Sequence, residues 1–231
     1  MLKMVNFNAI ITFFSTRMFS GINIKYIFSF LSVFLITFCA YSQTKNIRYH
    51  KDNFTFDYHV LTNDTSVKEG HYRLFYKNRI IENGNFSENK RTGKWQFFSL
   101  NGILEYEYDF NNGRIVKLSG KNQEELQRMT PCLFLGSPLI PYLYIVNKMH
   151  YPEKARVKKL GGRVILALKI NRKGELWSMY LYKKLDPVLD SEVMRVARSF
   201  PDNWQWLPAT RNGTKIDGEY LISIEFDPED L

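Results

Sequence analysis

The stretch RVILALKI at residues 163–170 decides the fold of the C-terminal half. Apolar side chains occupy every second position of it: Val164, Leu166, Leu168 and Ile170. This period of two is typical of a strand with one buried face. The sequence NRKG at 171–174 predicts a hairpin loop, so residues 175–183 are predicted to return as a second strand.

A helix is predicted on each side of this hairpin. Pro152 suits the first turn of a short helix, and Gly161-Gly162 ends it. After the hairpin, Asp186 can cap a second helix whose first turn tolerates Pro187. The apolar face of this second helix is formed by Leu189, Val193, Val196, Ala197 and Phe200.

The last predicted strand covers residues 220–226. The order helix, strand, strand, helix, strand predicts an α+β fold, a small two-helix domain with a three-stranded antiparallel sheet at residues 131–227. Because the last strand follows a long crossover, it is predicted to lie at a sheet edge, where unpaired backbone groups can receive a partner strand. Its candidate partner-binding residues are Tyr220, Leu221, Ser223 and Glu225.

Residues 47–118 have a different composition, rich in Tyr, Phe, Asn and Gly. Turns are predicted at Asn83-Gly84, Asn101-Gly102 and Asn112-Gly113. GHYRLF at 70–75 aligns with GKWQFF at 93–98, an offset of 23 residues. One hairpin cannot bury its aromatic face, so antiparallel β-hairpin repeats stacked into a continuous sheet are predicted. Its core aromatics are predicted to be Trp95, Phe98 and Tyr106, with a ligand groove on the aromatic sheet as the alternative.

Residues 119–130 are polar and are predicted to be a linker, with a short helix possible at 123–128. Pro131, Pro138 and Pro141 then punctuate an apolar run, which predicts a packed segment leading into the C-terminal domain.

The C-terminal half resembles the TonB C-terminal domain family over about 95 residues. The motifs that carry the resemblance are Tyr151-Pro152-Glu153-Lys154-Ala155, Gly162-Arg163-Val164, Gly174, Leu189-Asp190, Pro201, Trp206-Leu207-Pro208, Asn212-Gly213 and Phe226. Upstream, Phe134-Leu135-Gly136 and Tyr144-Ile145-Val146-Asn147 look like the segment that precedes the domain in Bacteroidetes-type members.

The hairpin half resembles the bacterial variant of the MORN-type repeat over 50–65 residues. Its second unit carries the motif best, through Gly93, Trp95, Phe98, Asn101, Gly102, Leu104 and Gly113. Its first unit is degenerate, with Tyr72 in place of the Trp.

Together the resemblances imply a binding module rather than an enzyme. A TonB-like domain implies binding of an extended segment from an outer-membrane transporter or another envelope protein, either as energy transducer or as adaptor. The long Pro/Lys-rich spacer of a full transducer is absent, and the hairpin repeats occupy its place. The second hypothesis is a scaffolding envelope protein that uses the repeat sheet for protein interaction. A homodimer is also possible.

The N-terminal 42 residues are typical of a signal peptide. Lys25 precedes an apolar run, YIFSFLSVFLITFCA at 26–40, and Ala40-Tyr41-Ser42 predicts cleavage between Ser42 and Gln43. This indicates export to the periplasm. The alternatives are an inner-membrane anchor facing the periplasm and lipidation at Cys39, and the true start is either Met1 or Met18.

The composition excludes several classes of protein. Hydrophobic residues make up 45% of the chain, which rules out wholesale disorder, and two Cys rule out a disulfide scaffold. Export argues against nucleic acid as the partner that the net charge of +9 suggests. Eleven basic and two acidic residues lie between Lys148 and Lys184. Lys154, Lys158 and Lys159 on the first helix form either a solvated face or a docking surface for anionic envelope material.

No catalytic or metal-binding constellation can be placed from the sequence. His50, His59, His71 and His150 have no ligand spacing, and no phosphate loop or nucleophile elbow is present. Cys132 is predicted to be a buried thiol, and Asp190 to have a structural role at a helix start. No cofactor and no enzymatic activity are therefore expected.

Overall fold

The computed structural model describes residues 43–227. The predicted signal peptide, with Ser42 and Cys39, lies outside them, and Gln43 directly precedes the first strand. None of the helices within 43–227 is long and apolar enough to span a bilayer.

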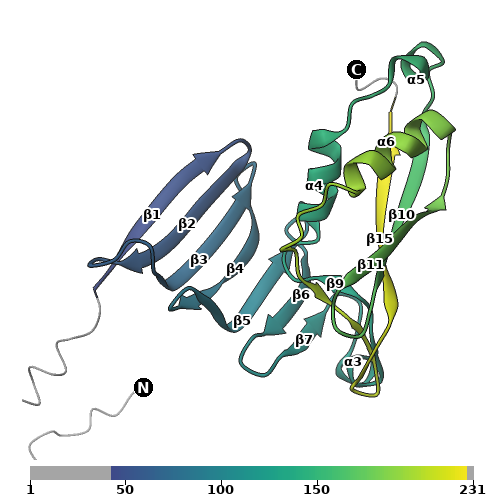
Figure 1. The fold of residues 1–231 in the computed structure, drawn as a ribbon. Helices are drawn as coiled ribbons and strands as arrows, with labels where there is room; N and C mark the ends of the chain where they lie inside the picture. Colours follow the sequence, from purple (N-terminus) through teal and green to yellow (C-terminus); the bar gives the residue numbers. More distant parts are fainter. Residues whose placement is uncertain (1–42, 228–231) are drawn as a thin grey trace, which may run out of the picture. The chain divides into compact units, whose positions relative to one another are not determined.

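The N-terminal half is a seven-stranded antiparallel sheet in which each strand pairs with the next along the chain (Figure 1). The strands are β1 (Thr44–Lys51), β2 (Phe54–Leu61), β3 (Lys68–Tyr76), β4 (Arg79–Ser87), β5 (Lys90–Phe98), β6 (Leu104–Asp109) and β7 (Arg114–Leu118). The prediction of consecutive hairpins forming one sheet is thus confirmed. It leaves β1 and β7 as the two edges.

One face of this sheet carries a row of contacting aromatic rings. Trp95, Phe97 and Tyr106 are fully buried there, and the Phe97 and Tyr106 rings stack with centroids 4.5 Å apart. The prediction that Phe98 belongs to this core is wrong, since Phe98 is only half-buried. Side chains alternate along a strand, so Phe97, two residues after Trp95, shares its face and Phe98 does not.

Two of the three predicted Asn-Gly turns are confirmed, at Gly102 (φ 74°) and Gly113 (φ 62°). The turn predicted at Asn83-Gly84 is wrong, because both residues lie inside β4. The register shifts between Asn83 and Asn85, and the ring of Trp95 occupies the space where a side chain at 84 would stand. Glycine is required at this position for close packing rather than for a turn.

The segment predicted to be a linker carries helix α3 (Gln123–Arg128), which confirms the short helix expected there. Asn122 and Glu125 form a reciprocal capping box at its start. It packs against β7 and against strand β8 (Met129–Thr130). The division into domains at 47–118 and 131–227 stays a prediction.

The C-terminal half contains more elements than the two helices and three strands predicted. Its helices are α4 (Leu139–Lys148), α5 (Glu153–Val157) and α6 (Pro187–Ala197). Helix α4 was not predicted, because a proline such as Pro141 is more typical of a break in the chain than of a helix. Pro141 lies in the first turn of α4, where a missing N–H costs no hydrogen bond.

The predicted three-stranded sheet is confirmed, in the order β11-β10-β15. It consists of β10 (Gly162–Ile170), β11 (Leu176–Lys183) and β15 (Gly218–Phe226). Helices α4, α5 and α6 share a core with one face of this sheet. As predicted, the carboxylate of Asp186 caps α6 by accepting from the Val188 N–H at 2.9 Å. Asp190 accepts from the Leu185 N–H at 2.9 Å, which confirms its structural role.

Two small sheets complete the half. Strand β9 (Leu133–Phe134) pairs with β12 (Trp206–Leu207). Strand β13 (Ala209–Arg211) lies between β8 and β14 (Thr214–Ile216). Through β8, the segment that leaves the seven-stranded sheet is tied to the region just before β15.

Residues 134–137 are bound to the aromatic face of the seven-stranded sheet by buried polar contacts. The Tyr106 hydroxyl donates to the Phe134 carbonyl and accepts from the Gly136 N–H at 3.0 Å. The Ser137 N–H donates to the carboxylate of Glu82 at 2.8 Å. Leu139 and Leu143 of α4 extend the sheet's apolar core. The two halves of residues 44–227 therefore share one packed interface.

Candidate functional site

The predicted partner-binding strand is an edge strand. All nine residues of β15 pair with β10, from Gly162 opposite Phe226 to Ile170 opposite Gly218. No other described strand pairs with β15. The backbone groups on its far side therefore have no strand partner among residues 43–227, which is the condition for addition of an extended segment.

The core holds β15 by its inward side chains. Ile222, Ile224 and Phe226 are buried, and the ring of Tyr220 packs on Trp206 with centroids 5.2 Å apart. This burial raises the pKa of the Tyr220 hydroxyl far above its ordinary value. Tyr220 thus helps to fix the strand and lies on the opposite face from the other three candidate residues.

The outward side chains Leu221, Ser223 and Glu225 are exposed, Leu221 by 50%. Glu225 accepts a hydrogen bond from the Arg163 guanidinium at 2.8 Å across the sheet. Both side chains are more than half exposed, so this ion pair contributes little to stability. Ser223 and Leu221 have no ion pair on this face and are exposed to a partner's side chains.

Sequence analysis missed that the aromatic side chains of β11 continue this outward face. Trp177 is 60% exposed and Tyr182 is 64% exposed. Tyr180 donates to the Glu219 carboxylate at 3.0 Å, and this hydrogen bond raises the pKa of the Tyr180 hydroxyl. The signal was present in the sequence WSMYLYK at 177–183, where aromatic residues recur on the face opposite the buried Leu166 row.

The three lysines proposed for an anionic surface are all exposed. Lys154 lies in α5, while Lys158 and Lys159 follow its last residue. The helix is much shorter than predicted, because the chain leaves the helical conformation at Lys159, which has a φ of 48°. The structure brings these lysines to one end of the domain, and nothing in it identifies a ligand for them.

The described residues contain no cluster of three or more His, Cys, Asp or Glu side chains able to hold a metal ion. Cys132 is buried, as predicted, and burial raises the pKa of its thiol. A Cβ at Gly218 would lie 2.9 Å from the Cys132 sulfur, so this thiol packs tightly against β15. The raised pKa disfavours the thiolate that a nucleophile requires.

The part of the chain that contains the edge strand is similar to a known family. Residues 147–228 match the family model of the Gram-negative bacterial TonB protein C-terminal. We refer to these residues as the TonB-like domain. It spans α5, the sheet β11-β10-β15, α6 and the strands from β12 onward, and it leaves the seven-stranded sheet outside the match.

Two solution structures of the Helicobacter pylori TonB C-terminal domain are similar to the chain, each at 19% identity with a TM-score of 0.29. They cover 36% and 39% of this chain, and 73% and 92% of their own chains. No curated protein matches the chain.

Proposed function

We propose that this chain is a non-enzymatic periplasmic binding module linked to outer-membrane transport. Its TonB-like domain would bind an extended segment of an outer-membrane transporter or another envelope protein at the free edge of β15, either in energy transduction or as an adaptor to it. The observation that supports this most is the position of β15, which is paired along its whole length on one side and has no strand from residues 43–227 on the other.

Strand addition suits this edge physically. Main-chain hydrogen bonds to β15 supply affinity, and alternate side chains supply specificity. Ile222, Ile224 and Phe226 anchor β15 in the core, so the edge is rigid before a partner arrives. A preorganised edge loses less conformational entropy on binding than a mobile one.

Capture of envelope proteins by the full chain, with identification of the bound proteins, tests this function. Ser223→Pro and Ile224→Pro remove one backbone N–H each. Successive N–H groups along a strand point to opposite sides, so one of the two variants loses an N–H that points away from β10. The variant that loses the outward N–H should retain its circular dichroism spectrum and lose capture of outer-membrane proteins. Ser223→Ala is the matched control and should bind normally. Undiminished capture by both proline variants in the folded state would overturn binding at β15.

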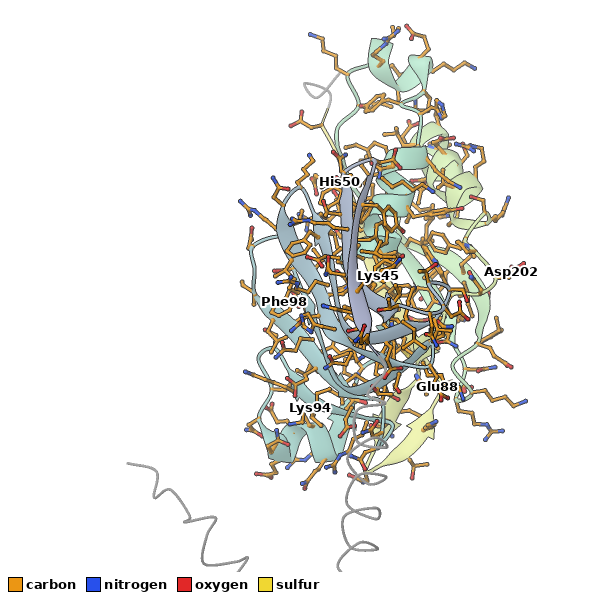
Figure 2. All side chains as sticks on the ribbon, turned by 90° about the vertical axis from the view of Figure 1, so that its left-hand side faces the viewer. Lys45, His50, Glu88, Lys94, Phe98 and Asp202 are labelled. Carbon is orange, nitrogen blue, oxygen red and sulfur yellow. The ribbon has the colours of Figure 1, made fainter. Side chains whose placement is uncertain are left out.

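The second candidate function is scaffolding through the seven-stranded sheet. Strand β1 favours it, since β1 is an edge strand with seven of its eight residues exposed. Side chains such as Lys45 and His50 project from it (Figure 2). If this function holds, deletion of residues 44–61 abolishes capture while the β15 variants leave it intact.

Localisation and assembly are part of the proposal. The TonB-like domain supports a periplasmic location, with the leader removed or retained as an anchor. Pairing of two β15 edges would give a homodimer, which sedimentation of the purified chain would detect. Lys154, Lys158 and Lys159 would add salt-dependent attraction to anionic envelope surfaces.

A further inference from the structure

A cavity of about 930 Å³ lies between β7, α3 and the small sheet β8-β13-β14. None of its lining residues belongs to β15, so it is separate from the proposed partner edge. Its volume falls within the range of ordinary ligand sites. Figure 1 shows α3 close to the end of the seven-stranded sheet where β7 lies.

One wall of the cavity is the free edge of a sheet. Strand β7 pairs only with β6 among the described strands, and Arg114, Ile115 and Val116 of β7 line the cavity. The side-chain amide of Gln123 donates to the Val116 carbonyl at 3.0 Å. This carbonyl therefore already accepts a hydrogen bond, and a strand added at β7 would replace Gln123 there.

The opposite wall is a row of polar side chains across the small sheet. Thr210 stands opposite Thr130 on β8 and opposite Lys215 on β14, so the three side chains share one face. The two threonine hydroxyls are 2.8 Å apart. Hydroxyl and ammonium groups in such a row can donate to carboxylates or to backbone carbonyls.

The lining of the cavity carries an excess of positive charge, with Arg114, Arg128 and Lys215 against the one carboxylate of Glu124. Arg114 and Lys215 line it, and neither forms an ion pair with a carboxylate within residues 43–227. Asp109, which pairs with Arg114 across β6 and β7, accepts from the Asn111 and Asn112 N–H groups, and its pKa is lowered by hydrogen bonds from Asn112 first and also by the charge of Arg114. A third cation, Arg128, is neutralised by Glu124 at 3.1 Å.

Apolar side chains complete the lining. Leu126 and Leu207, both buried, line the cavity together with Ile115 and Pro208. A ligand that fits must therefore combine apolar groups, negative charge and a backbone able to pair with a strand edge.

We propose that this cavity is a second peptide-binding site, which receives an extended acidic segment as an added strand on β7. Its carboxylates would meet Arg114 and Lys215, and its apolar side chains would cover Leu126 and Leu207. The free strand edge favours a peptide over a lipid or a small anion, because only a peptide backbone satisfies it repeatedly. The site is independent of the proposed function at β15.

Fluorescence anisotropy on the full chain tests the proposal with a labelled, blocked octapeptide that alternates Glu and Val. The peptide should bind, and the affinity should fall with added salt. A matched peptide of alternating Lys and Val should bind at least tenfold more weakly. The Glu/Val peptide with N-methylated backbone amides keeps its charge and should also lose binding, because it can no longer pair with β7.

Substitution of the cavity's cations tests whether the peptide binds there. Arg114→Ala combined with Lys215→Ala should weaken binding of the Glu/Val peptide roughly tenfold, since two charge contacts are removed. The matched control, Lys45→Ala with Arg48→Ala, removes two cations from β1 at the other edge of the same sheet and should bind normally. Ser223→Pro should bind normally as well, which separates this site from β15.

Three results would overturn the proposal. They are equal binding of the Glu/Val and Lys/Val peptides, full affinity in the folded Arg114→Ala, Lys215→Ala variant, and unchanged binding of the N-methylated peptide. Binding of vesicles rich in anionic phospholipid, lost in the double variant while the Glu/Val peptide fails to bind, would assign the cavity to lipid headgroups instead.

Discussion

The indole ring of Trp95 packs so closely on the α-carbon of Gly84 that a Cβ built there would lie 2.2 Å from the ring. The Trp95 N–H donates to the neighbouring Asn85 carbonyl at 3.1 Å, which holds the ring in this place. The aromatic core of the seven-stranded sheet is therefore built around the absence of one side chain.

Gly84→Ala should destabilise the protein by about 3 kcal/mol, the upper end of the cost of overpacking a core. Urea denaturation followed by tryptophan fluorescence measures it. Gly102→Ala is the matched control, because Gly102 has open space around it and only a positive φ. That variant should lose about 1 kcal/mol. An equal loss in the free energy of unfolding for both variants would show that the Trp95 ring moves to make room for a side chain at position 84.

Tyr106→Phe should cost about 1–2 kcal/mol, because the Phe134 carbonyl and the Gly136 N–H lose a buried partner. The loss of stability should appear in the same transition for the seven-stranded sheet and the TonB-like domain. The bond joins the sheet to residues 134–136, and β9 in turn pairs with β12 of that domain. Separate transitions for Trp95 and for Trp204 fluorescence would show instead that the halves unfold independently. Single-tryptophan variants report on each half.

The buried carboxyl of Glu82 should make the free energy of unfolding depend on pH. Burial raises the pKa of this carboxyl, against the opposing effects of Arg91 and of the Ser137 N–H. A raised pKa in the folded state means that folding favours the protonated form. The free energy of unfolding should therefore fall as the pH rises from about 4.3, the ordinary value, through the folded pKa.

The difference between the wild type and Glu82→Gln isolates this effect, because the other carboxyls are common to both proteins. Asp57 and Glu192, whose pKa values are lowered, cause the opposite loss below about pH 4 in both. The difference in the free energy of unfolding should change only across the Glu82 window. A pH-independent difference would mean that the pKa of Glu82 is the same in the folded and the unfolded protein.

Processing should produce a mature chain that begins at Gln43. The apolar run at 26–40 followed by Ala40-Tyr41-Ser42 predicts this cut. Intact mass of the exported protein measures it directly. A membrane-bound chain with the leader retained would favour the anchor, and a mass increase of a lipid on Cys39 would favour lipidation.

Periodicity predicted the elements that have one exposed and one buried face. β10 has its alternating Val164, Leu166, Leu168 and Ile170 all buried, and β15 lies at the predicted edge. Asp186 and Pro187 located the start of α6 because capping depends on neighbours along the chain. Local chemistry decides these features, so a single sequence reveals them.

Features that depend on distant residues were not predictable in this way. Asn83-Gly84 is typical of a turn when only neighbouring residues are considered. In the structure it lies inside β4, where the ring of Trp95 from the next strand packs on Gly84. Helix α4 is apolar around much of its surface because it packs on both cores, so its sequence lacks a clear polar stripe. The cavity beside β7 gathers residues from positions 108 to 215, which no spacing rule connects.

The seven-stranded sheet and the TonB-like domain differ in how far apart in the chain their paired strands lie. Each strand of the sheet pairs with its immediate neighbour, whereas β10 and β15 close a loop from Ile170 to Gly218. Local pairings form quickly and long-range pairings slowly. We expect the seven-stranded sheet to form first and β15 to be the last of the described strands to join. The β15 edge then exists only after the residues up to Phe226 have folded onto β10.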